Sequence, residues 1–296
     1  MRILVTGSEG QVARCLAERA TGHELIFARR PDFDLGDFAS IERAVAAVAP
    51  DLVIGAAAYT DVERAEDQPD LAMRVNGEAP GVLAAAAARA GAGIVHLSTD
   101  YVFDGTGTRP YREDDPVNPL GAYGASKRAG EVAVAASGAR YAIVRTAWVH
   151  SPFGRNFART MLRLAGTRDA IDVVEDQRGS PTSAFDLADA LLRVAEAWHD
   201  DPEQGADQIY HCAGDGETNW ADFARAIFAE SARHGGPVAE VRGIPAASYP
   251  AQAPRPGYSR LDSGKFARTF GYRPPDWRES LAPVVARIVR DSRTVS

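Results

Sequence analysis

The sequence predicts an α/β fold with a doubly wound parallel sheet and a smaller C-terminal α/β domain. Through the first half of the 296 residues, short apolar runs alternate with alanine-rich segments. The runs are apolar at nearly every position, as in strands that are buried on both faces. A glycine-containing turn directly follows the first run. Beyond about Trp148 the alternation becomes irregular. We therefore expect one domain over residues 1–148 and a second mainly over 149–296, with later segments able to return to the first.

Each apolar run is short enough for a strand, and each alanine-rich segment is long enough for a helix. In the first half, strands are expected at Ile3–Val5, Glu24–Ala28, Leu52–Ala56, Ile94–Ser98 and Tyr141–Arg145, and helices at Gln11–Ala20, Ile41–Val48, Leu71–Ala90 and Ala122–Ala136. In the second half, helices are expected at Asn156–Leu164, Phe185–Ala197 and Ala221–Ala232, and strands at Asp172–Val174 and Ile209–His211. Frequent prolines and glycines predict irregular structure from Gly235 to Tyr258.

The composition argues against several classes of protein. A net charge of −7 is unfavourable for non-specific binding of nucleic acid. The longest aliphatic stretch, Val82–Ala88, is too short to span a membrane. Cys15 and Cys212 are the only cysteines, which predicts neither a disulfide framework nor a cysteine-rich metal site. No signal-peptide pattern follows Met1, so we expect a cytoplasmic protein.

The turn after the first strand has the residues of a dinucleotide-binding turn in a Rossmann-like fold. Gly7 permits a tight turn, Gly10 lets the backbone approach a pyrophosphate, and Ala13 permits close packing of helix on sheet. The phosphates would lie at the helix N-terminus, which favours anions. After the second strand, Arg29 and Arg30 stand where arginine accommodates a 2′-phosphate. This favours NADPH as the cofactor and leaves NADH possible.

Tyr123 and Lys127 point most directly to a reaction. Four residues apart on a predicted helix, they share one face. We expect the Lys127 ammonium to lower the pKa of Tyr123 toward neutrality, so that the phenol can donate and recover a proton. Downstream of a dinucleotide turn, such a pair predicts carbonyl reduction or alcohol oxidation.

Longer motifs extend this interpretation along the chain. They are Gly10-Gln11-Val12, the block from Ala56 to Glu63, Val75-Asn76, the block from Ser98 to Phe103, Asn118-Pro119, Tyr123-Gly124 with Lys127, Arg145-Thr146 with Trp148-Val149, Asn156-Phe157, Asp176-Gln177 with Gly179 and Pro181-Thr182, and Ser259-Arg260-Leu261. With them, the chain resembles the dTDP-4-dehydrorhamnose reductase family of the extended short-chain dehydrogenase/reductases over nearly its whole length.

The resemblance implies NADPH-dependent reduction of the C4 keto group of dTDP-4-dehydro-β-L-rhamnose, a dTDP-4-keto-6-deoxy sugar. The product would be dTDP-β-L-rhamnose, a precursor of cell-surface polysaccharide. On this resemblance Tyr123 protonates the forming alkoxide, Lys127 holds the nicotinamide ribose, and Thr99 hydrogen-bonds the C4 oxygen. The expected cofactor contacts are Gly7, Gly10, Gln11, Val12, Arg29, Arg30, Asp37, Phe38, Ala57, Ala58, Tyr59, Thr60, Tyr123 and Lys127. The expected substrate contacts are Thr99, Asp100, Trp148, Asn156 and Arg260, whose guanidinium suits a diphosphate.

Other functions remain open at this stage. The chain could reduce another dTDP-4-keto-deoxysugar, or serve as an NADP-binding regulatory subunit without turnover. A related dehydratase is disfavoured, because such enzymes carry an Asp-Glu pair after the threonine and here Asp100 precedes Tyr101. Some relatives dimerise through magnesium held by a glutamate where this chain has Cys15. We therefore expect no metal requirement, and a monomer or weak homodimer.

Overall fold

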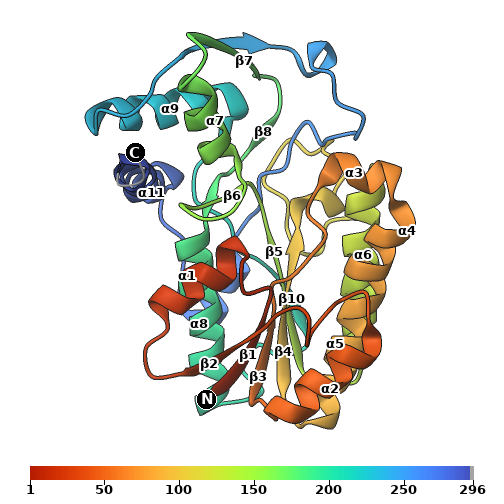
Figure 1. Cartoon of the computed structure of the whole chain (residues 1–296). Coiled ribbons are helices and arrows are strands. Elements are labelled where there is room, and N and C mark those ends of the chain that lie inside the picture. The colour runs from red at the N-terminus through yellow and green to blue at the C-terminus, as the bar shows by residue number, and fades with distance from the viewer. Residues whose placement is uncertain (294–296) are drawn as a thin grey trace.

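The computed structural model describes residues 1–293, and its central sheet has six parallel strands, which confirms the predicted fold class (Figure 1). The strand order is β10-β5-β4-β3-β1-β2. The chain leaves β1 toward β2 and then returns to β3 on the other side of β1, so a topological switch point lies between β1 and β3. The strands are β1 (Arg2–Thr6), β2 (Glu24–Ala28), β3 (Leu52–Gly55), β4 (Gly93–Thr99), β5 (Tyr141–Thr146) and β10 (Gln208–His211).

Helices cover both faces of this sheet (Figure 1). On one face, α1 (Gln11–Arg19) packs against α8 (Ala184–Asp200), and their buried side chains are apolar. On the other face lie α2 (Phe38–Val48), α5 (Ala79–Arg89) and α6 (Ala122–Ala135). Because α8 and β10 come from the second half of the chain, residues beyond 149 contribute to this layer as well as to the next one.

The segment expected as one helix over Leu71–Ala90 is interrupted. It begins with α4 (Pro69–Ala72), continues as a π-helical stretch η1 (Met73–Glu78), and ends as α5. Within η1, the Asn76 amide accepts a hydrogen bond from the N–H of Tyr59 at 2.8 Å and donates to the Tyr59 carbonyl at 2.9 Å. The wider turn thus lets a helix side chain hold the loop after β3, which is a common use of π-bulges near functional sites.

A second layer lies beyond the carboxyl ends of the sheet strands (Figure 1, top). Its core combines buried side chains of α7, β7, α9 and α11. The elements not yet named, which include those of this layer, are α3 (Val62–Asp67), η2 (Asp100–Val102), β6 (Val149–His150), α7 (Phe157–Ala165), β7 (Ala170–Val174), β8 (Arg178–Gly179), β9 (Thr182–Ser183), β11 (Thr218–Asn219), α9 (Trp220–Arg233), β12 (Glu240–Ile244), η3 (Ala246–Ser248), α10 (Gly264–Phe270) and α11 (Trp277–Arg293).

The prediction of irregular structure from Gly235 to Tyr258 is wrong in part. β12 lies inside this stretch and pairs in parallel with β7, with Glu240 opposite Ala170. Pro237 and Pro245 flank the strand, and prolines are typical of irregular segments, so the sequence did not predict a strand here. The backbone hydrogen bonds of β12 come from its pairing with β7, which is distant in the sequence. Among residues 1–293, no helix is both long enough and apolar enough to cross a membrane.

Candidate active site

The turn between β1 and α1 has the geometry that a bound pyrophosphate needs. Gly7 has a φ of +82°, and a Cβ placed there would lie 3.0 Å from the Cβ of Ala57. Glycine is therefore required both by backbone conformation and by space. Gly10 is the N-cap of α1 and has no side chain to satisfy the N–H groups of the first helical turn. Those N–H groups are available to an anion.

A groove of about 1190 Å³ runs from this turn, across the carboxyl ends of the strands, to α6. All the expected cofactor residues except Asp37 and Phe38 line it. The Asp37 carboxylate instead accepts a hydrogen bond from the N–H of Ala39 and caps α2, and the Phe38 ring packs under the Arg74 guanidinium at 4.5 Å. For Asp37 and Phe38, the structure thus shows roles in and around α2 and no place in the groove lining.

Several residues outside the expected cofactor contacts also line the groove, some of them from the motifs quoted above. They lie mainly at the ends of β4 and β5 and in the loops facing them: Leu71, Val75, Leu97, Ser98, Thr146, Val149, Gly154, Arg155 and Leu187. For Leu97, Ser98 and Thr146 a signal was present, since ligands of open α/β sheets bind outside the carboxyl ends of the strands. The others come from segments whose proximity depends on the tertiary fold.

The loop after β3 is fixed from two sides. The Thr6 hydroxyl oxygen accepts hydrogen bonds from the N–H groups of Ala56 and Ala57 at 3.1 and 3.0 Å. Asn76 holds the next turn of the loop through both backbone groups of Tyr59. This part of the groove is therefore preorganised by a strand residue and a helix residue on either side of it.

The structure contradicts the expected pKa of Tyr123. Burial raises the pKa of the phenol to about 12, hydrogen bonding with Thr99 lowers it, and the charge of Asp100 raises it. Lys127 is not among the groups that move it. The Lys127 ammonium donates instead to the carbonyl of Leu97 at 2.6 Å. The sequence placed both side chains on one helix face correctly, but it could not show that desolvation of the phenol would dominate.

Thr99 ends β4 and Asp100 begins η2, directly beside this pair. The Thr99 hydroxyl donates to Asp100 Oδ1 at 3.0 Å and accepts from the N–H of Tyr101 at 3.2 Å. Asp100 is buried, and burial raises its carboxyl pKa to about 6. The Tyr101 ring meets the Tyr123 ring edge to face, with centroids 5.5 Å apart. Thr99 is thus oriented by a buried acid next to the Tyr123 phenol.

Trp148 and Asn156 do not line the groove, but each is next in sequence to a residue that does, Val149 and Arg155 respectively. Trp148 has an unusual φ of +50°, and its half-buried ring stacks on Trp220 with centroids 3.6 Å apart. The Asn156 amide nitrogen donates to Gln11 Oε1 at 2.9 Å, and its oxygen caps α7. Asn156 therefore connects α7 to the glycine turn. Trp148 presents an aromatic surface of the kind that stacks on sugars and bases.

Arg260 lies apart from the groove lining. Its guanidinium pairs with Asp215 at 3.5 Å and with Glu217 at 3.9 Å. Arg155 lines the groove, and its side chain is 89% exposed with only a long contact of 3.8 Å to Asp61. Of these two arginines, Arg155 is the one that the structure places at the groove.

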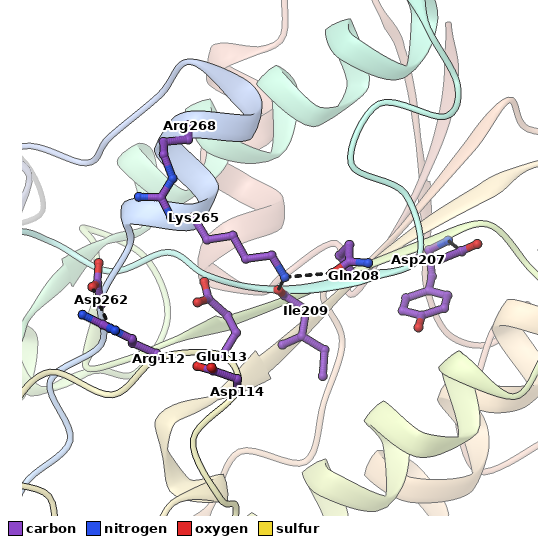
Figure 2. A pocket seen from close by; sticks show the side chains of 10 residues that line it. Arg112, Glu113, Asp114, Asp207, Gln208, Ile209, Asp262, Lys265 and Arg268 are labelled. Carbon is purple, nitrogen blue, oxygen red and sulfur yellow. Dashed lines mark hydrogen bonds and ion pairs between the residues drawn. The ribbon is translucent and has the colours of Figure 1, made fainter.

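A second hollow of about 800 Å³ lies at the outer edge of β10 (Figure 2). There the Lys265 ammonium donates to Gln208 Oε1 and to the Ile209 carbonyl, both at 2.9 Å, and Glu113 accepts from the N–H of His211. These side chains satisfy backbone groups of an edge strand, as edge-protecting residues do. No expected site residue lines this hollow.

Comparison with known proteins agrees with this geometry. The sequence profile of the family described as RmlD substrate binding domain matches residues 1–290. A dTDP-4-dehydrorhamnose reductase of Sinorhizobium fredii is 42% identical, over 99% of both chains. A crystal structure of a dTDP-4-dehydrorhamnose reductase from Clostridium acetobutylicum superposes with a TM-score of 0.89 and 36% identity, covering 97% of this chain and 99% of that one.

A further solved structure carries a nucleotide. It is a dTDP-4-dehydrorhamnose reductase from Bacillus anthracis in complex with NADP, with a TM-score of 0.88, 32% identity, and coverage of 97% of this chain and 99% of that one. The matched profile and the relatives both span nearly the full length of this sequence. The chain belongs to the dTDP-4-dehydrorhamnose reductase family.

Proposed function

We propose that this protein reduces the C4 keto group of dTDP-4-dehydro-β-L-rhamnose with NADPH to give dTDP-β-L-rhamnose. The observation that carries the proposal is a single groove lined by the glycine turn at one end and by Tyr123 and Lys127 at the other. Full-length relatives named for this reaction support the substrate, and a relative in complex with NADP supports the cofactor.

The residues of the groove fit a dinucleotide. The positive φ of Gly7 and its contact with Ala57 leave no room for a side chain where the pyrophosphate would approach. Arg29 lines the groove and, among residues 1–293, forms no ion pair, whereas Arg30 is paired with Asp34 at 2.7 Å. Arg29 is therefore the better candidate for a 2′-phosphate. When bound, NADPH supplies the hydride.

The raised pKa of Tyr123 suits a proton donor. With a pKa of about 12, the phenol is protonated throughout the physiological range. It is still more acidic than an ordinary alcohol, so it can protonate an oxygen on which negative charge develops. The Thr99 hydroxyl lies beside the phenol and is held there by donating its hydrogen to Asp100. Reduction therefore does not require the phenolate that the sequence led us to expect.

The test is an absorbance assay of reduced-nicotinamide consumption with a panel of nucleotide-linked 4-keto sugars, comparing NADPH with NADH. The expected result is the highest kcat/KM with dTDP-4-dehydro-β-L-rhamnose and NADPH. A clear preference for another dTDP-4-keto-deoxysugar would replace the substrate. NADPH binding without turnover on any keto sugar would support the regulatory-subunit alternative.

The proposal includes a cytoplasmic monomer or weak homodimer that binds no nucleic acid. A net charge of −7 supports the absence of nucleic-acid binding. Both cysteines are unpaired and buried, which fits a reducing compartment. Cys15 packs inside the core between α1 and α8, so that position offers no surface ligand for a bridging metal. Sedimentation with and without EDTA tests the oligomeric state and its independence of metal.

A further inference from the structure

Lys127 is an ammonium in an unusually enclosed setting. Lys127 is only 3% exposed. Its Nζ donates to the Leu97 carbonyl at 2.6 Å and lies 3.4 Å from His96 Nε2. Burial lowers the pKa of Lys127 to about 8, so the side chain loses charge easily. A lysine that must attract a cofactor ribose and favour charge on a neighbouring oxygen needs a device that keeps it protonated.

Glu131 lies one helical turn after Lys127 on α6 and is also buried, at 1% exposure. Its carboxylate accepts hydrogen bonds from the Ser98 hydroxyl at 2.7 Å and from Arg128 at 2.8 Å. Arg145 donates through Nε at 2.7 Å and through Nη2 at 2.8 Å. These donors, led by Arg145, hold the carboxyl pKa of Glu131 below its usual range despite burial, so the group is an anion at neutral pH.

The same contacts connect three elements of the site. Glu131 belongs to α6, Ser98 to β4 and Arg145 to β5. Ser98 follows Leu97, whose carbonyl accepts from Lys127, so the lysine and the carboxylate are tied to adjacent residues of one strand. Arg145 is itself held in place, with its guanidinium over the Phe103 ring at 5.2 Å and Nη1 3.5 Å from His211 Nε2.

We propose that Glu131 is a positioning residue for the reaction: anchored by Ser98 and Arg145, it ties α6 to β4 and β5, and its carboxylate, one helical turn from Lys127 and not paired with it, favours the charged ammonium that the Leu97 carbonyl holds against β4. This inference deepens the proposed function. Only the kinetic part of its test depends on that function, and the titration of Lys127 does not. Glu131 does not line the groove and acts through Lys127.

The other ionisable groups around Lys127 cannot take over this role. His96 on β4 is neutral, because burial and the Lys127 charge hold its pKa well below the usual value. Tyr123 on α6 is a neutral phenol at physiological pH. Asp100 on η2 acts on Tyr123, and Arg145 on β5 is a cation. Glu131 is the acid whose charge raises the pKa of Lys127.

The sequence makes a direct measurement possible, because Lys127 and Lys265 are the only lysines. In protein labelled with ¹³C-lysine, an NMR pH titration follows both ε-carbons without cofactor or substrate. Lys127 of the unmodified protein is expected to titrate near pH 8. In Glu131→Gln its midpoint falls by about one unit, a tenfold loss of proton affinity. Lys265, at the edge of β10 (Figure 2), is the internal control and stays unchanged.

Two further variants separate positioning from folding. Glu131→Gln leaves Arg145 buried without its anion, which can unfold the protein, so the double variant Glu131→Gln/Arg145→Met removes both charges. It is expected to fold and to keep the lowered Lys127 midpoint. Glu131→Asp retains the charge and is expected to restore the midpoint to within about half a unit.

An unchanged Lys127 midpoint in any folded variant that lacks the carboxylate overturns the inference, and so does a midpoint in Glu131→Asp as low as that in Glu131→Gln. With NADPH and the keto sugar, the alkaline limb of kcat/KM should move down in parallel with the NMR midpoint. A shifted midpoint in a protein that turns over no keto sugar would leave the role of Glu131 intact and refute the proposed function instead.

Discussion

The cofactor end and the substrate end of the candidate site are built in different ways. The cofactor end consists of consecutive segments, the turn after β1, the arginines after β2 and the loop after β3, and its shape depends on backbone conformation. The expected substrate end lies outside the lining of the groove and depends on side chains that are distant in sequence, such as the stacked pair Trp148 and Trp220. The first end is specified by short motifs, and the second by the tertiary fold.

Because the two ends are built differently, cofactor affinity and substrate affinity should respond to different kinds of substitution. Cofactor affinity should respond to changes that move backbone, since a pyrophosphate is bound by N–H groups. Substrate affinity should respond to loss of aromatic surface. Between the two ends stand Tyr123, Lys127 and Thr99. Loss of the Tyr123 or Thr99 hydroxyl should affect the chemical step alone, whereas loss of Lys127 should also weaken cofactor binding.

The largest expected effect is that of Tyr123→Phe. Removal of the phenolic proton should lower kcat by about 10³-fold, which is within the usual contribution of a general acid. NADPH affinity, measured by fluorescence titration, should change by less than about twofold because the ring is retained. Near-normal turnover in this variant would show that another group supplies the proton.

The next effect tests the cofactor end. Gly7→Ala introduces a Cβ 3.0 Å from Ala57 at a φ of +82° and should weaken NADPH binding about thirtyfold, or about 2 kcal/mol. Gly22→Ala is the matched control, since Gly22 has a φ of +79° and nothing within 4 Å of a Cβ. Both variants should lose about 1 kcal/mol of stability through backbone strain, and only the first should lose affinity. Equal cofactor affinities would mean that the turn does not hold the phosphates.

The same contrast explains what sequence could predict. The parallel sheet and the glycine turn follow from apolar runs and from glycine spacing, which are local properties, and both are found in the structure, where β10 from the second half adds a sixth strand. β12 was missed because its partner β7 lies far away in the chain. Trp220 was missed because its relation to the site exists only through Trp148.

The error over Tyr123 has a different origin. Helical spacing correctly placed Lys127 on the same face, but a pKa depends on burial as well as on charge. Thr99, Asp100 and Tyr101 lie next to Tyr123 only after the chain has folded, and the burial of the phenol depends equally on the tertiary fold. Motif geometry was therefore predictable, while the balance between desolvation and charge was not.

A smaller effect tests the substrate end. Trp220→Ala removes the ring that stacks on Trp148 and should raise KM for the dTDP sugar about tenfold, corresponding to the usual energy of an aromatic pair. The dissociation constant of NADPH should stay the same. Trp198→Phe serves as the control, since Trp198 is a core residue of α8 outside the groove lining. A change in NADPH affinity in Trp220→Ala would show that the two ends do not bind their ligands independently.

The smallest expected effect distinguishes between the two arginines at the cofactor end. Arg29 and Arg30 are neighbours, yet Arg30 is paired with Asp34 whereas Arg29 forms no ion pair among residues 1–293. Arg29→Ala should therefore reduce the preference for NADPH over NADH about fivefold, the effect expected of one exposed charge, and Arg30→Ala should change it less. The ratio of kcat/KM for the two cofactors at low salt measures this. The reverse order of effects would mean that Arg30 leaves Asp34 when the cofactor binds, and that the unbound pairing does not predict which guanidinium meets the phosphate.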